Sequence, residues 1–125
     1  MIKKYIYFLP SLLIMSTIFY LSSMPSTGID GTKAEQFLIH KTLHIFVYAS
    51  LSASFYFALS KSNQKLTKNI STSSLVFTYL YGVSDEIHQY FIPGRGAKFT
   101  DTLFDLFGAF LGILIYRQLI KTSKK

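Results

Sequence analysis

Four stretches of the sequence are apolar enough to form long helices, and polar segments separate them. The first covers about 5–22 and holds no charged side chain. The second covers about 40–60, and between Lys41 and Lys61 it contains no acid, lysine or arginine. A membrane-spanning helix needs about 20 predominantly apolar residues, so both stretches qualify. Pro10 predicts a bend in the first helix, which membrane helices tolerate.

The third and fourth stretches reach spanning length only if their helices include acidic side chains. The third covers 70–91. The residue before Pro93 disfavours helical dihedrals, which predicts that the helix ends near 91. The fourth covers about 100–120. The polar residues that these two helices must contain are Asp85, Glu86, His88, Gln89, Asp101 and Asp105. The pattern therefore predicts an all-α protein, a polytopic membrane four-helix bundle that forms a single domain over 1–125.

The composition indicates that lipid is the solvent of these helices. Half of the 125 residues are hydrophobic and only 15% are charged. A soluble domain of this size would have to hide more apolar surface than a small core can hold. Cysteine is absent, which excludes disulfides and thiolate metal sites. A cleaved signal peptide is the alternative for the first stretch, because lysines precede it, but no clear small-x-small cleavage site follows.

The charges separate toward two sets of helix ends. One set carries nine basic residues and no acid, and the other carries four basic residues and all six acids. The positive-inside rule then predicts a multi-pass protein of the cell membrane with both termini in the cytoplasm. Basic ends beside anionic lipid headgroups explain the net charge of +7 without nucleic acid. The nine are Lys3, Lys4, Lys61, Lys65, Lys68, Arg117, Lys121, Lys124 and Lys125; the four are Lys33, Lys41, Arg95 and Lys98.

Polar residues fall on one face of each of three helices, near the acidic ends. At 100° per residue, each group below occupies a limited arc of its helix. The G-x-x-x-G spacing in the last group also lets another helix approach closely. Ionisable groups are costly in a membrane, so an outward-facing pocket shared by three helices is a functional-site hypothesis. The groups are Lys41, His44 and Tyr48 with His40; Asp85, His88 and Gln89 with Glu86 at the edge; and Asp101 and Asp105 with Gly108 and Gly112.

Three interpretations of this pocket remain open. In the first, Arg95, Lys41 and protonated histidines only neutralise the acids, because buried charges need partners. In the second, the pocket takes a phosphate-bearing lipid headgroup, with His88 or His44 as a base or as a ligand of a divalent metal. The acids would repel phosphate there unless an ion or Arg95 intervened. In the third, the pocket is a binding or transport cavity without chemistry.

Four short motifs resemble the signature of the VanZ-like family, and together they cover nearly the whole chain. The longest, D-E-x-x-Q-x-x-x-P-G-R, is the specific one. The chain departs from the pattern at Val47, where many members carry an acid, and at Asp105, where other members carry asparagine. The motifs lie at 85–95, at 101–108 (D-x-x-x-D-x-x-G), at 41–48 (K-x-x-H-x-x-x-Y) and at 22–25 (S-S-x-P).

The resemblance implies a small integral membrane protein, and some members are linked to low-level resistance to teicoplanin-type glycopeptides. No established reaction comes with the family. Such antibiotics act at the outer surface on lipid-linked wall precursors, which is where the predicted topology places the motifs. We therefore expect an envelope protein whose partners are membrane lipids, including a lipid-linked envelope precursor. A metal-dependent enzyme on a lipid headgroup and a small transporter are the alternatives.

The predicted site residues divide between two roles. The acids and histidines would handle a proton or a divalent metal, and Arg95 would contact phosphate. The catalytic candidates are Asp85, Glu86, His88 and His44. The ligand-binding candidates are Arg95, Gln89, Lys41, Tyr48, Asp101 and Asp105.

Overall fold

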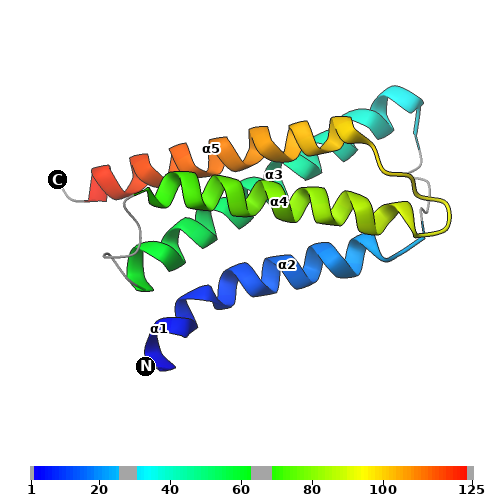
Figure 1. Cartoon of the computed structure of the whole chain (residues 1–125). Coiled ribbons are helices and arrows are strands. Elements are labelled where there is room, and N and C mark those ends of the chain that lie inside the picture. The colour runs from blue at the N-terminus through cyan, green and yellow to red at the C-terminus, as the bar shows by residue number, and fades with distance from the viewer. Residues whose placement is uncertain (1, 26–30, 63–68, 124–125) are drawn as a thin grey trace.

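The computed structural model describes residues 2–25, 31–62 and 69–123, and all its regular structure is helical (Figure 1). No strand occurs in these ranges. The prediction of an all-α protein with four long helices is confirmed. The elements are α1 (Ile2–Tyr5), the 3₁₀ turn η1 (Ile6–Phe8), α2 (Leu9–Ser22), α3 (Lys33–Ser62), α4 (Ile70–Tyr90) and α5 (Phe99–Ser123).

The four long helices lie alongside one another. Figure 1 places the N- and C-terminal ends of the chain at the same end of the array, and the α4–α5 connection at the opposite end. Helix α3 packs most extensively against α5, and α2 lies against α3 and α4. Side chains near the α4–α5 connection therefore meet far from both termini.

The first helical segment is interrupted before Pro10. The prediction placed one bent helix over 5–22, whereas the structure has a 3₁₀ turn at Ile6–Phe8 and begins the long helix at Leu9. Proline has no N–H and its ring clashes with the carbonyl four residues earlier, which here belongs to Ile6. In the first turn of α2 the missing N–H costs nothing, because that donor has no partner in any helix.

Helix α3 begins at Lys33 rather than near 40, which corrects the predicted boundary. Thr32 and Glu35 form a capping box at its start. The Thr32 N–H donates to Glu35 Oε2 at 2.7 Å, and the Glu35 N–H donates to Thr32 Oγ1 at 3.3 Å. This reciprocal pair satisfies backbone donors that the first turn leaves free. The T-x-x-E spacing was the signal in the sequence for this earlier start.

The interior of the protein is more polar than its surface. The described residues include six buried hydrophobic side chains and twelve buried polar or charged ones. Large apolar side chains such as Phe46, Leu80 and Phe110 are exposed instead. Exposed apolar surface on this scale marks contact with a membrane or a partner. Together with the polar interior, it favours lipid as the surroundings.

Two described helices, α3 and α5, are long and apolar enough to cross a membrane, and Ile6–Ser22 is a shorter apolar helix. Helix α4 has sufficient length, but small and polar residues form a stripe along its buried face. Such residues let helices approach closely and hydrogen-bond within a membrane. The composition of α4 therefore reflects contact with other helices. The stripe consists of Ser74, Thr78, Gly82, Asp85, Glu86 and Gln89.

Gly108 and Gly112 bring α5 into contact with the backbone of α3. A Cβ atom at Gly108 would overlap the carbonyl oxygen of Ile45, and one at Gly112 would overlap that of Ala49. The close approach predicted from the G-x-x-x-G spacing is confirmed, and the partner is α3. This contact sets the distance between the polar residues of the two helices.

We expect Gly108→Ala and Gly112→Ala each to destabilise the protein. The added methyl group meets backbone, which cannot rotate away, so the cost is at least the ~1–3 kcal/mol typical of overpacking. Thermal unfolding in detergent, followed by circular dichroism, measures it. Gly96→Ala is the matched control, because nothing lies within 4 Å of a Cβ atom there. Melting of Gly112→Ala at the wild-type temperature would contradict the close contact.

Candidate functional site

Three helices bring eight of the predicted site residues together near the α4–α5 connection. Seven of them are buried and His44 is half-buried. The burial agrees with the inward faces expected from helical spacing. The eight are Lys41, His44 and Tyr48 of α3, Asp85, Glu86 and Gln89 of α4, and Asp101 and Asp105 of α5.

An ion pair and a hydrogen bond connect α3 with α5. Lys41 Nζ pairs with Asp101 Oδ1, which also accepts a hydrogen bond from Thr100 Oγ1 at 3.2 Å. His44 Nδ1 lies 2.7 Å from Asp105 Oδ1. An ionised carboxylate only accepts hydrogen bonds, so His44 carries its hydrogen on Nδ1. Lys41 and His44 thus form their shortest contacts with different acids of α5.

Asp105 is fully buried because α4 leaves room for it at Gly82. A Cβ atom at Gly82 would lie 3.0 Å from Asp105 Oδ2 and 3.2 Å from Tyr48 Cε1. Asp105 Oδ2 and the Tyr48 hydroxyl have no hydrogen-bond partner within the described ranges. The sequence analysis did not single out Gly82. A glycine inside an otherwise helical segment, three residues before the acidic motif, was its signal.

Glu86 faces the interior, although helical spacing placed it at the edge of the polar arc. Its Oε2 accepts the backbone N–H of Lys98 at 2.8 Å, which ties α4 to the segment before α5. Its Oε1 is buried and has no partner among the described residues. One oxygen of this carboxylate is therefore fixed by the backbone, and the other is buried without a hydrogen-bond partner from the described residues.

Gln89 links Asp85 with Arg95. Its amide nitrogen donates to Asp85 Oδ2 at 2.8 Å, and its Oε1 accepts from Arg95 Nη1 at 3.3 Å. Arg95 also donates from Nε to the carbonyl of Met24 at 2.8 Å and from Nη2 to that of Leu21 at 3.0 Å. These carbonyls lie in the last turn of α2 and just beyond it, where a cation is electrostatically favoured. Arg95 therefore holds α2 against the α4–α5 connection.

His88 contacts α2 rather than the carboxylates. Its ring stacks on Phe19 with centroids 4.7 Å apart, and its Nε2 lies 2.9 Å from Ser23 Oγ. The Ser23 hydroxyl donates its hydrogen to the Phe19 carbonyl at 2.6 Å. The contact between His88 and Ser23 therefore needs its hydrogen on His88 Nε2, which donates to Ser23 Oγ. Its position on α4, two residues beyond Glu86, turns the ring away from α5. The predicted role of His88 as a base or ligand beside the acids thus lacks the expected geometry.

A cavity of about 180 Å³ lies between α2, α3 and α4. One part of its wall is apolar and comes from α2 and α3. The other part is polar and includes five of the predicted site residues. The apolar residues were not predicted as site residues, because on a membrane helix they are indistinguishable from those that face lipid. The apolar wall consists of Ile18, Leu21, Leu43 and Val47; the polar wall consists of Ser22, His40, His44, Tyr48, Asp85, Gln89 and Arg95.

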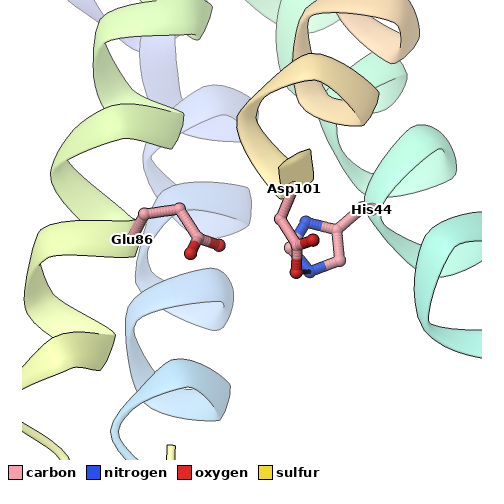
Figure 2. Close-up of side chains that lie close together, drawn as sticks. All are labelled: His44, Glu86 and Asp101. Atoms are coloured by element: carbon pink, nitrogen blue, oxygen red, sulfur yellow. Dashed lines mark ion pairs between the residues drawn. The ribbon is translucent and has the colours of Figure 1, made fainter. Parts of the chain in front are cut away.

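Three of the predicted residues are arranged as metal ligands would be. His44, Glu86 and Asp101 each offer one donor atom, and these atoms lie within 4.8 Å of one another. Figure 2 shows the Glu86 side chain extending from α4 toward Asp101 of α5 and His44 of α3. His44 also lines the cavity, so the cluster and the cavity share one side chain.

A family model describes almost the entire chain. The model of the VanZ/LLP1 family matches residues 6–121, a range that includes every site residue described above. No curated protein and no solved structure matches the chain. All four motifs that resembled a VanZ-like signature therefore lie within the residues that this family model matches. The chain belongs to the VanZ/LLP1 family.

Proposed function

We propose that this protein is a four-pass membrane protein of the cell envelope, and that its cavity binds the headgroup of a phosphate-bearing envelope lipid. The observation that carries the proposal is the divided wall of the cavity. Apolar side chains of α2 and α3 suit an acyl or prenyl chain, and the polar side chains suit the headgroup.

The cavity size favours a headgroup over a whole lipid. At about 180 Å³ it is smaller than the roughly 300–1,000 Å³ of pockets that enclose drug-sized ligands. A lipid would place only its polar end and the first part of its chain inside. The rest of the chain would stay in the bilayer, beside the exposed apolar side chains of α2 and α3.

Arg95 is the residue that would contact phosphate. Three of its donors are bound to Met24, Leu21 and Gln89, and the second hydrogen on each Nη atom remains for a ligand. Its guanidinium is thereby held at the edge of the cavity in one orientation. A preorganised guanidinium is the usual protein group for phosphate oxygens, which it can bind in pairs.

The proposed topology places this cavity at the outer surface. Basic residues dominate the helix ends that share a side with the termini, and all six acids belong to the opposite side. By the positive-inside rule the termini and the α3–α4 connection are then cytoplasmic. Lipid-linked wall precursors are exposed on the outer side, which is the basis for proposing a contribution to resistance against teicoplanin-type glycopeptides.

A metal-dependent enzyme acting on the same headgroup is the second candidate function. The arrangement of His44, Glu86 and Asp101 favours it, because three ligands leave a metal position open for substrate. Such an enzyme would hydrolyse short-chain phosphatidic acid to diacylglycerol and phosphate only with a divalent ion present. Phosphate release that persists in Glu86→Gln would exclude this site as its origin.

We expect a single cysteine at Gly96 to react with an impermeant maleimide in intact cells. The chain has no native cysteine, and a side chain at Gly96 meets open space. A cysteine at Lys121, at the opposite end of the array, should react only after the membrane is opened. The reversed pattern would overturn the outward orientation.

We expect the purified protein to bind dioctanoyl phosphatidic acid saturably, and dioctanoylglycerol, which lacks the phosphate, much more weakly. Native mass spectrometry or a detergent-based binding titration measures both. Arg95→Gln should raise the dissociation constant by roughly 10- to 100-fold, since hydrogen bonds to charged groups contribute about 1.5–3 kcal/mol. Lys98→Gln is the matched control, because the structure uses the backbone N–H of Lys98.

A second variant separates loss of the phosphate contact from loss of the α2 contacts of Arg95. Val47→Phe fills the cavity without changing any charge, and Val47 is only half-buried. It should abolish binding of phosphatidic acid while leaving the circular dichroism spectrum unchanged. Unaltered binding by Val47→Phe would place the lipid elsewhere.

A further inference from the structure

The buried acids outnumber the basic groups that neutralise them. Four carboxylates, those of Asp85, Glu86, Asp101 and Asp105, are buried near the α4–α5 connection. Besides His44, which contacts Asp105, the basic groups in contact with them or with their partners are Lys41, which pairs with Asp101, and Arg95, which reaches Asp85 through Gln89. Two formal negative charges remain when His44 is neutral. Buried charge without compensation is strongly unfavourable, so bound protons or a bound cation must neutralise these two charges.

His44 is positioned as a metal-binding histidine. Its Nδ1 hydrogen is committed to Asp105 Oδ1 at 2.7 Å, so Nε2 carries the lone pair. This carboxylate–histidine pair is the usual arrangement behind a metal, because it fixes the tautomer and the orientation of the ring. His44 Nε2 lies 4.0 Å from Asp101 Oδ2, which is too far for a hydrogen bond. A tetrahedral cation with bonds of about 2.0–2.2 Å holds its ligands roughly 3.3–3.6 Å apart, so binding would bring these two atoms about 0.5 Å closer.

Glu86 provides an independent indication of a ligand. It is 5% exposed, and its Oε1 has no hydrogen-bond partner in the described part of the chain. Its other oxygen is held by the Lys98 N–H, which fixes the direction of the side chain toward α5. Native proteins rarely bury an unpaired carboxylate oxygen, so a group that the chain itself does not supply is expected beside it.

Each of the three side chains is therefore held by one atom and offers another. His44 is held at Nδ1, Glu86 at Oε2, and Asp101 at Oδ1 by Lys41 and Thr100. The atoms that remain are a neutral imidazole nitrogen and two carboxylate oxygens. Helices α3, α4 and α5 contribute one each, so the site exists only when all three helices pack (Figure 2).

We propose that His44, Glu86 and Asp101 bind one divalent cation, with Asp105 positioning the His44 ring. One nitrogen and two oxygens suit Zn²⁺ or Mn²⁺ better than Ca²⁺, which prefers six to eight oxygen ligands. The cation supplies two positive charges, which equal the two negative charges that Lys41 and Arg95 leave uncompensated. If the cavity takes a phosphate headgroup as proposed above, the ion also offsets the repulsion between that phosphate and the acids.

Metal binding is tested without lipid, so that its failure is separate from failure of the proposed lipid function. The full-length protein, purified in detergent without a polyhistidine tag and stripped with EDTA, is titrated with Zn²⁺ and with Mn²⁺. Elemental analysis after dialysis gives the stoichiometry, and thermal unfolding gives the stabilisation. We expect one ion per chain and a melting temperature that rises with metal concentration. Absence of both effects for both ions would overturn the proposal.

Three variants define the ligands. Glu86→Gln should remove the metal-dependent rise in melting temperature, while the stripped variant melts no lower than the stripped wild type, because an unpaired buried charge is gone. Asp105→Asn should weaken metal affinity by about 10- to 100-fold through the His44 ring. Glu35→Gln is the matched control, since Glu35 is exposed and glutamine also completes a capping box. A Glu86→Gln variant with wild-type metal affinity would show that the ion binds elsewhere.

Discussion

The backbone contact between α3 and α5 is the constraint on which the polar interior depends. Gly108 and Gly112 let the two helices approach until side chains at the glycines would overlap α3. At that separation Lys41 reaches Asp101 and His44 reaches Asp105. Wider spacing would leave the buried Lys41, the half-buried His44 and two buried acids without partners, at a cost far above that of a normal packing defect.

The two proposed sites share one interior because α4 presents different residues to its two neighbours. Asp85 and Gln89 face α2 and the cavity, where Arg95 completes the polar wall. Glu86 faces α5, and one of its carboxylate oxygens lies within 4.8 Å of donor atoms of Asp101 and His44. His44 belongs to both groups, so the proposed lipid pocket and the proposed metal site are adjacent and share one ligand. Binding in one is therefore expected to alter the charge that the other presents.

The sequence by itself determined the helices, their approximate bounds and the inward faces of three of them. Long apolar stretches, Pro93 and the G-x-x-x-G spacing are local signals, and local backbone preferences act the same way wherever the helix packs. The sequence also indicated which residues would form the candidate site, because ionisable residues are rare in apolar helices. Thr32 and Glu35 also indicated the start of α3 at Lys33, although the sequence analysis placed that start near residue 40.

Only the tertiary structure decided which residue pairs with which. Helical spacing grouped His88 with Asp85, yet the arc shared by two residues does not say which neighbouring helix each of them meets. Because α2 packs against α4, His88 contacts Ser23 and Phe19. Because α5 packs against α4, Glu86 is buried in the interior. The cavity wall from α2 was likewise unpredictable, since an apolar side chain on a membrane helix is equally compatible with lipid or with a ligand. Pairing depends on distances between helices, and those are set by long-range packing that no single segment encodes.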